Sequence, residues 1–179
     1  MRAMRAAVLT VSDRCSRGEA EDTSGPALVA MLRERLGAEV VRTGCLPDER
    51  EQLAACFVEW SKGGVDLIVS TGGTGLSPRD VTPEAAKSVL EREHSGLMEL
   101  ARLRCMANTV RTFLSRGVAG TIGRTLVLTL PGSPRGATEM LEALVDVLPH
   151  AVETLRGEVQ DDGRPGAESV TGRVVRHVD

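Results

Sequence analysis

Short runs of apolar residues alternate with amphipathic stretches along most of this chain. Compact apolar runs predict strands buried on both faces at residues 6–11, 65–70 and 125–130, and Val40 and Val41 predict another that ends near Pro47. Strands that alternate with helices across short loops are typical of a parallel or mostly parallel sheet. The pattern therefore predicts an α/β fold.

Apolar residues at helical spacing predict helices between these strands. The predicted helix starts are Ser24, Asp48, Thr82, Ser95 or Gly96, and Pro134. The last apolar face continues from Ala137 to Leu148, and residues 13–23 form a charged, flexible stretch. Residues 1–156 are predicted to form a single domain. Residues 157–179 are predicted to be a C-terminal extension that is loosely ordered or adds an edge strand at 170–178.

The composition is that of an ordinary soluble globule except for a shortage of aromatic rings. Phe57, Phe113 and Trp60 are the only aromatic residues among 179. Proteins that bind single-stranded nucleic acids stack bases on such rings. The net charge of −3 also argues against a protein that binds the phosphate backbone. We therefore expect no nucleic-acid partner.

The four cysteines and three histidines are scattered along the chain, with no CxxC pair. A structural zinc site needs ligands clustered in pairs, so none is expected. The chain enters its first strand without a signal peptide, and no apolar run approaches the ~18 residues of a membrane span. These features predict a cytoplasmic protein with reduced thiols and no membrane partner.

Three predicted strands end in loops that suit the binding of a small anionic ligand. In open α/β sheets, ligands bind beyond the carboxyl ends of the strands, so these loops are expected to lie together. The loop residues are Ser12, Asp13 and Arg14 after the first strand, Thr71, Gly72, Gly73, Thr74 and Gly75 after the third, and Pro131, Gly132, Ser133 and Arg135 after the last.

The glycine-rich loop lets successive backbone N–H groups turn toward an anion, because no Cβ atoms obstruct the approach. Its sequence is neither a Walker loop nor a GxGxxG dinucleotide site, and a tight turn from strand to helix is the structural alternative. Pro134 suits the first position of a helix, whose N-terminus attracts phosphate or carboxylate groups. Arg79 and Arg135 could bind such an anion in a bidentate manner or could simply be solvated.

Two aspartates, Asp48 and Asp80, fall near these loops in the predicted fold. Two carboxylates would repel a phosphate unless a divalent cation bridges them, and Mg²⁺ binds one or two carboxylates together with substrate phosphates. The structural alternatives are an N-cap role for Asp48 and a turn role for Asp80.

Five segments together resemble the molybdenum-cofactor biosynthesis family, also called the molybdopterin-binding domain. They are residues 9–14 (LTVSDR), 22–26 (DTSGP), 71–75 (TGGTG), 79–84 (RDVTPE) and 130–134 (LPGSP). The resemblance runs from about Ala6 to Arg156 in order and spacing. Within the family, the chain is similar to molybdopterin adenylyltransferases and their relatives.

This resemblance implies a three-layer α/β/α fold, commonly assembled as a homotrimer. It also implies that ATP and Mg²⁺ activate molybdopterin as its adenylate, ready for molybdate insertion by a partner enzyme. The two functionally critical aspartates of the family fall on Asp48 and Asp80, as catalytic and metal-binding residues. A non-catalytic protein that binds or delivers molybdopterin is the alternative.

Overall fold

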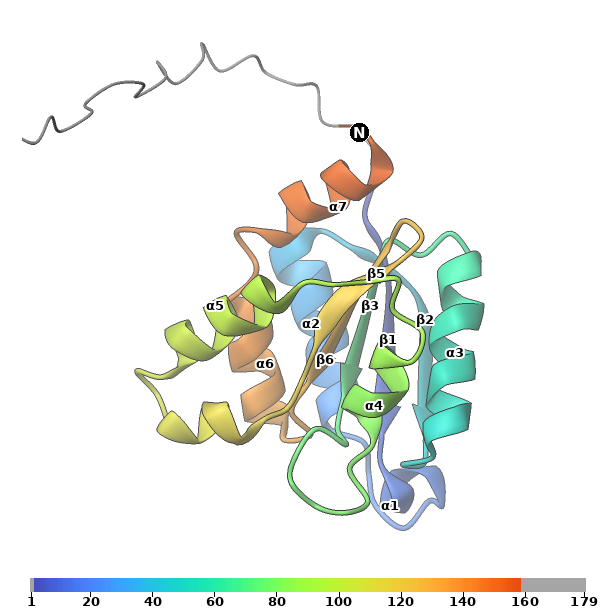
Figure 1. The fold of residues 1–179 in the computed structure, drawn as a ribbon, viewed down its shortest axis with the longest axis vertical. Helices are drawn as coiled ribbons and strands as arrows, with labels where there is room; N and C mark the ends of the chain where they lie inside the picture. The colour runs from blue at the N-terminus through green and yellow to red at the C-terminus, as the bar shows by residue number, and fades with distance from the viewer. Residues whose placement is uncertain (1, 159–179) are drawn as a thin grey trace, which may run out of the picture.

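A six-stranded sheet forms the middle layer of the structure, a computed structural model that describes residues 2–158 (Figure 1). The strands are β1 (Arg5–Val11), β2 (Glu39–Leu46), β3 (Leu67–Thr71), β4 (Arg92–Glu93), β5 (Ala119–Ile122) and β6 (Thr125–Leu130). Their order in the sheet is β2-β1-β3-β6-β5-β4. The first four in this order are parallel to one another, and β5 runs antiparallel to both β6 and β4. The predicted, mostly parallel α/β sheet is confirmed.

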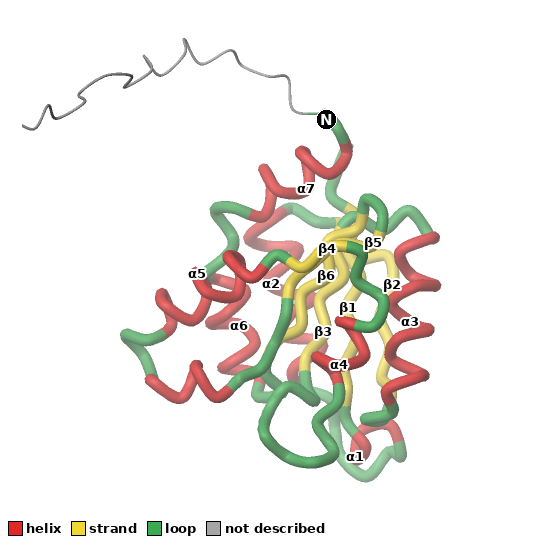
Figure 2. The backbone as a smooth tube through the Cα atoms, in the orientation of Figure 1, coloured by secondary structure: helices red, strands yellow, loops and turns green. Residues whose placement is uncertain are grey.

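Helices cover both faces of this sheet (Figures 1 and 2). They are α1 (Asp13–Ser16), α2 (Ser24–Leu36), α3 (Arg50–Lys62), α4 (Thr82–Lys87), α5 (Ser95–Cys105), the 3₁₀ helix η1 (Val110–Leu114), α6 (Pro134–Glu142) and α7 (Leu148–Arg156). Helices α3 and α4 pack on one face, and α2, α5, α6 and α7 pack on the other. The three-layer α/β/α architecture implied by the resemblance is therefore confirmed.

The two faces of the sheet carry separate apolar cores because successive strand residues point to opposite sides. Val8 packs with the leucines of α2 and α6 in the larger core, whereas Leu9 packs with α3 in the smaller one. Phe57 and Trp60 are buried in this smaller core, as their spacing predicts. Both aromatic side chains are thus used for packing.

Several local predictions were wrong, for identifiable reasons. The stretch expected to be flexible begins with the short helix α1, capped by Ser12. The single helix expected from Ala137 to Leu148 is two helices, because Pro149 at the start of α7 lacks the N–H that a continuous helix requires. Strands β4 and β5 and η1 were not predicted. The expectations for residues 159–179 lie outside the described part of the chain.

The two ends of the sheet are held in different ways. At the amino ends of the strands, the buried carboxylate of Asp66 accepts hydrogen bonds from Arg156 (2.6 and 3.0 Å), from Arg2 (2.8 Å) and from the Arg5 amide (2.8 Å). We call Asp66, Arg2 and Arg156 the amino-edge cluster. It ties α7 to the start of the chain. At the opposite end, the loops after β1, β3 and β6 gather beside α1, at the bottom of Figure 1.

Candidate functional site

The three loops predicted to carry the chemistry are joined by hydrogen bonds at the carboxyl ends of the strands. The Gly72 amide donates to the Leu130 carbonyl (3.1 Å), and the Thr71 hydroxyl donates to the Pro131 carbonyl (2.7 Å). The Ser12 amide donates to the Leu46 carbonyl (2.9 Å) and so joins the first loop to the end of β2. The sheet therefore brings these distant segments into one place.

The backbone of the glycine-rich loop can be adopted only with glycine at its second and third positions. Gly72 and Gly73 have φ values of 107° and 65°, a region that other residues rarely adopt. A Cβ on Gly72 would lie 2.1 Å from the Val11 carbonyl oxygen. Within residues 2–158, the amides of Gly73, Thr74 and Gly75 donate no hydrogen bond. Consecutive backbone amides without acceptors are the groups from which proteins build anion-binding concavities.

Both predicted aspartates face this loop. A Cβ on Gly73 would lie 2.6 Å from Asp48 Oδ1, and a Cβ on Gly75 would lie 2.8 Å from Asp80 Oδ2. Asp80 is oriented by the Ser77 amide, which donates to Oδ2 (3.0 Å). The N-cap interpretation of Asp48 was wrong, because Glu49 occupies that position and α3 begins at Arg50. The Asp48 side chain is therefore not used to start a helix.

The charge of Asp48 is poorly compensated. Burial raises the pKa of this carboxyl above its ordinary value, and repulsion from Asp13 and Asp80 raises it further. Asp48 Oδ1 is buried and has no hydrogen-bond partner among the described residues, and the same holds for Thr82 Oγ1. Both atoms lie within 3 Å of the position that a Cβ on Gly73 would take. Two buried oxygens without hydrogen-bond partners thus pack against Gly73.

These oxygens fit the requirements of Mg²⁺, a hard cation that prefers oxygen ligands and retains waters and phosphate oxygens. Asp48 and Asp80 would supply its carboxylates. Across residues 2–158, no group of three or more His, Cys, Asp or Glu residues is arranged to hold a metal. A cation at this site would therefore need phosphate oxygens or waters to complete its coordination.

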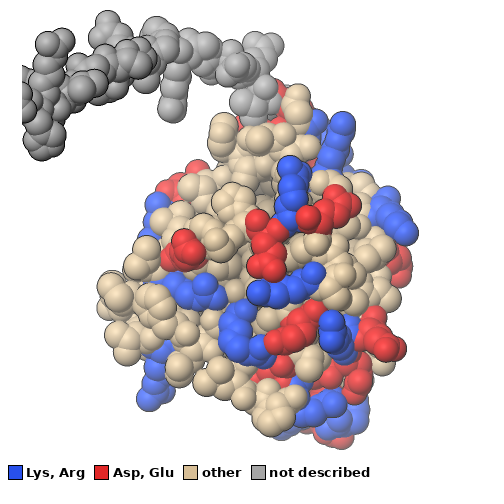
Figure 3. Space-filling model, viewed as in Figure 1, with Lys and Arg blue, Asp and Glu red and all other residues tan. Residues whose placement is uncertain are grey.

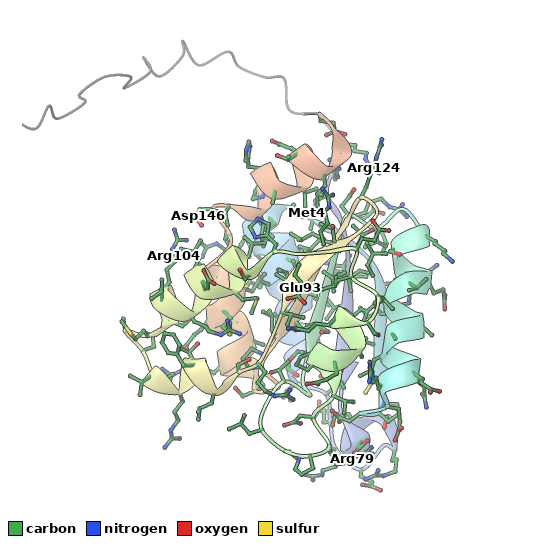
Figure 4. The ribbon with its side chains drawn as sticks, in the orientation of Figure 1. Met4, Arg79, Glu93, Arg104, Arg124 and Asp146 are labelled. Carbon is green, nitrogen blue, oxygen red and sulfur yellow. The ribbon has the colours of Figure 1, made fainter. Side chains whose placement is uncertain are left out.

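Asp13 and Arg79 form an ion pair beside the two aspartates. Arg79 donates to both oxygens of Asp13 (2.9 and 3.1 Å) and to Glu49 (3.0 Å), and Figure 4 shows it at the loop next to α1. The Asp48 amide donates to Asp13 Oδ1 (3.1 Å). The hydrogen bonds from Arg79, and then that from the Asp48 amide, lower the pKa of Asp13. Asp13 is therefore ionised and joins the loops that carry Asp48 and Asp80.

A cavity of about 740 Å³ opens on the other side of the glycine-rich loop. Its walls come from that loop, from the segment between α5 and Ser115, and from the turn that begins α6. The lining residues are Thr74, Gly75, Leu76, Cys105, Asn108, Thr109, Arg111, Thr112, Leu114, Ser115, Pro131, Gly132, Ser133, Arg135, Gly136, Glu139 and Met140. This volume is in the range of pockets that hold cofactor-sized ligands. Asp48 and Asp80 do not line the cavity. Gly75 does line it, and a Cβ on Gly75 would lie 2.8 Å from Asp80 Oδ2.

Comparison with known proteins identifies the family. The family model described as a probable molybdopterin binding domain matches residues 7–150. The chain belongs to this family. The chain is 35% identical to the molybdopterin adenylyltransferase of Helicobacter pylori strain J99, over 88% of this chain and 90% of that protein.

Solved structures and longer relatives agree with this membership. The crystal structure of the molybdopterin biosynthesis enzyme MoaB from Thermus thermophilus has a TM-score of 0.81 and 47% identity, and the match covers 86% of this chain and 97% of that one. The molybdenum cofactor synthesis protein cinnamon of Drosophila melanogaster is 38% identical over 85% of this chain. The match spans only 26% of the length of cinnamon.

In this molybdopterin-binding domain, not all the predicted site residues reach the cavity or the carboxylates. Ser12 caps α1 and Thr71 is buried beneath the loop, so both hold the backbone in place. Arg14 is exposed at the surface. Arg135 lines the cavity but is 81% exposed and pairs with Glu139 (2.8 Å). Ser133 caps α6 by accepting from the Gly136 amide (3.1 Å), as the predicted helix start requires.

The residues from α5 to Ser115 form a wall of the cavity that was not predicted. Thr112 belongs to this wall, and its buried Oγ1 has no hydrogen-bond partner in the described chain. Arg116, the residue after Ser115, contacts the glycine-rich loop directly. Neither residue belongs to a recognisable motif, and the hydrogen-bond acceptors of the Arg116 side chain are distant in sequence. Only the fold brings them to the site.

On the face seen in Figure 3, basic and acidic side chains are interspersed. Pairs such as Lys87 with Glu93 (3.5 Å) account for part of this pattern. A protein that binds a nucleic-acid backbone presents a continuous basic surface. In the described chain, no helix is both long enough and apolar enough to cross a membrane.

Proposed function

We propose that the protein is a molybdopterin adenylyltransferase of molybdenum cofactor biosynthesis. It transfers AMP from ATP to the phosphate of molybdopterin and releases pyrophosphate. The observation that carries the proposal is the pairing of Asp48 and Asp80 with a glycine loop that has three free amides. Such a site can hold phosphate groups and a cation together, which is the arrangement that joining two anions requires.

The reaction needs alignment more than a strong base. The second pKa of a phosphate monoester is about 6, so the molybdopterin phosphate is largely ionised at pH 7. One of its oxygens attacks the α-phosphorus of ATP, and the bond from that phosphorus to the β-phosphate oxygen breaks. Pyrophosphate leaves with the electron pair of that bond. Catalysis then depends on positioning the two anions and reducing their repulsion.

Each part of the site has a proposed role in this reaction. Asp48 and Asp80 hold Mg²⁺, which when bound neutralises charge on the phosphate oxygens. The amides of residues 73–75 and the α6 N-terminus at Ser133 bind phosphates, with Arg135 at the rim of the cavity. Asp13 and Arg79 connect the loops around the two aspartates.

The cavity beside the glycine-rich loop suits a flat ring system that carries a phosphate, because the phosphate can then reach the amides of that loop. Its lining offers hydroxyls, amides and aliphatic side chains, and contains no aromatic ring. Ring recognition therefore depends on hydrogen bonds and aliphatic contacts. Thr112 supplies a hydroxyl whose oxygen has no partner within residues 2–158.

The alternative is a protein that binds or delivers molybdopterin without forming the adenylate. Such a protein needs the cavity but has no use for the uncompensated carboxylate of Asp48. Retention of Asp48 with a raised pKa and a buried, unpartnered oxygen favours the enzyme.

We further propose that the protein acts in the cytoplasm as a homotrimer and passes its product to a molybdate-insertion enzyme. Large apolar side chains are exposed on the lobe formed by α5 and η1: Leu103, Met106, Val110, Phe113 and Leu114. Exposed apolar surface of this kind supports association of copies. Sedimentation equilibrium should give three times the 19.0 kDa of one chain, and a mass of 19.0 kDa would contradict the trimer.

Replacement of Asp80 tests the assignment of the carboxylates. Asp80→Ala should abolish formation of adenylyl-molybdopterin while molybdopterin still binds, because the cavity does not include Asp80. The control is Asp146→Ala. It removes an exposed carboxylate that pairs with Arg104 of α5, away from the loop at Arg79 (Figure 4). Product formation by Asp80→Ala at the wild-type rate would eliminate Asp80 from the metal site.

A further inference from the structure

One arginine outside the predicted site contacts both the end of the glycine-rich loop and the segment that follows it. The Arg116 guanidinium donates to the Gly75 carbonyl (2.7 Å) and the Asp80 carbonyl (2.8 Å), and it forms an ion pair with Glu84. The Arg116 amide also donates to the Thr74 carbonyl (2.8 Å). Four contacts from one residue therefore span the chain from Thr74 to Glu84.

The backbone that carries Arg116 is itself firmly held. Arg102 of α5 donates to the carbonyls of Ser115 (3.0 Å) and Gly117 (2.8 Å). A Cβ on Gly117 would lie 2.2 Å from the Thr129 carbonyl oxygen, so this backbone lies directly against β6. The Val118 amide donates to the Thr129 hydroxyl (2.7 Å). Arg116 thus extends from a segment that is fixed between a helix and the central sheet.

The segment contacted by Arg116 is exposed in its middle and is anchored from two sides. Residues 76–79 are exposed, and two bonds between Ser77 and Asp80 (2.9 and 3.0 Å) hold the part around Asp80 internally. On one side, Arg79 forms ion pairs with Asp13 and Glu49. On the other side, the bonds of Arg116 to the Gly75 and Asp80 carbonyls bracket the exposed stretch. Because both carbonyls accept from one guanidinium, these bonds fix the backbone of Asp80 relative to Gly75.

We propose that Arg116 is a positioning residue that holds Asp80 in place for the adenylyl transfer. It acts through the loop backbone and contacts no reacting atom. Its planar guanidinium, with five donors, can satisfy two carbonyls and a carboxylate at once, which a lysine cannot do. The same residue joins the cavity wall at Ser115 to the loop that carries Asp80. This inference rests on the proposed function for its catalytic consequence.

The test compares Arg116→Ala with the wild-type protein and with Arg104→Ala. Arg104 is a matched control because it also donates to a carbonyl, that of Ala143 (2.7 Å), and to a carboxylate, that of Asp146 (2.6 Å). Figure 4 shows Arg104 on α5 and Asp146 beside it, both away from the loop at Arg79. Two quantities are measured: amide hydrogen exchange in residues 74–84, and the kcat and KM of adenylate formation.

Arg116→Ala should raise amide exchange at Ser77 and Asp80 at least tenfold, because these amides depend on the loop geometry. The kcat should fall about 100-fold, the loss expected when a catalytic group is misplaced by about 1 Å. The KM for molybdopterin should stay within about threefold, since the cavity wall remains. Methylguanidinium in solution should restore part of the kcat of Arg116→Ala, and Arg104→Ala should behave like the wild type throughout.

A kcat within twofold of the wild type, with or without looser exchange, would overturn the proposal. A fall in kcat without any change in loop exchange would also overturn it, because Arg116 would then act in some other way. If Arg116→Ala does not fold, Arg116→Lys takes its place. That variant should show about a tenfold loss of kcat and faster exchange, and wild-type values would overturn the proposal.

Failure of the proposed function would look different. A wild-type protein that makes no adenylate would reject the adenylyltransferase and with it the catalytic part of this inference. The exchange measurement would still report whether Arg116 fixes the loop.

Discussion

Asp66 and Asp48 lie at opposite ends of the strands of the same sheet, and their surroundings differ in hydrogen bonding and in charge. Burial raises the pKa of Asp66, but hydrogen bonds from Arg156 and the Arg5 amide outweigh this effect and lower it overall. Asp48 has no such compensation, and burial and its acidic neighbours raise its pKa. The amino-edge cluster uses its charges for stability, whereas the site around Asp48 leaves a charge available for a ligand.

The comparison teaches that aspartate burial alone does not identify a functional carboxylate. Asp66 is only 3% exposed, yet guanidinium and amide donors surround its carboxylate. The buried Oδ1 of Asp48 faces Gly73 and the hydroxyl oxygen of Thr82, and neither oxygen has a partner among the described residues. A carboxylate that lacks donors within its own fold is the better candidate for binding a cation.

Among the tests of this comparison, the largest expected effect is the loss of activity in Asp48→Asn. Removing the charge should reduce adenylate formation about 100- to 1,000-fold, comparable to losing one preorganised electrostatic contact to a transition state. The melting temperature should stay the same or rise, because the uncompensated carboxylate opposes folding. Activity assays and calorimetry on the same sample provide the check. A variant with lost activity and a much lower melting temperature would mean that Asp48 is structural.

Asp66→Asn should lower the stability and leave the activity unchanged. Breaking the buried ion pair leaves Arg156, whose side chain is 7% exposed, with only the more distant carboxylate of Glu158 (3.4 Å), and this costs about 3 kcal/mol of unfolding free energy. For a chain of this size the melting temperature should fall by about 10 °C. The kcat, measured well below that temperature, should be unchanged. A clear loss of kcat in the folded variant would contradict the conclusion that Asp66 contributes to stability and not to activity.

The smallest expected effect is on stability in acid. Because folding lowers the pKa of Asp66, its ionised carboxyl stabilises the fold above the unfolded pKa of about 3.9. This stabilisation is lost as the pH falls through the lower pKa of the folded state. The difference in melting temperature between wild type and Asp66→Asn should be constant from pH 5 to 8 and shrink below about pH 4. A difference that persists unchanged at the acid limit would contradict this role.

The helices and strands that could be predicted are those specified by their own local sequence pattern. β6 was predicted with both ends correct because Thr125–Leu130, four apolar residues and two threonines, is buried on both faces. β4 and β5 were missed because two and four residues are too short to show a period. The break between α6 and α7 was signalled by Pro149, but the apolar spacing across it concealed the break.

The parts of the candidate site that follow from the sheet topology could be predicted. Parallel strands place their carboxyl ends together, so the loops at Asp13, Gly72 and Ser133 could be grouped in advance. The ion pair between Arg79 and Asp13, 66 positions apart, could not be. Arg116 is at least 32 positions from the acceptors of its guanidinium, and its contacts exist only after the chain has folded.

The most direct test of the function is to incubate the wild-type protein with ATP, Mg²⁺ and molybdopterin and to measure both products. The proposed function predicts one pyrophosphate and one adenylyl-molybdopterin for each molybdopterin consumed. EDTA should stop the reaction and leave the circular dichroism spectrum unchanged. Binding of molybdopterin without release of pyrophosphate would contradict the adenylyltransferase and establish a protein that only binds it.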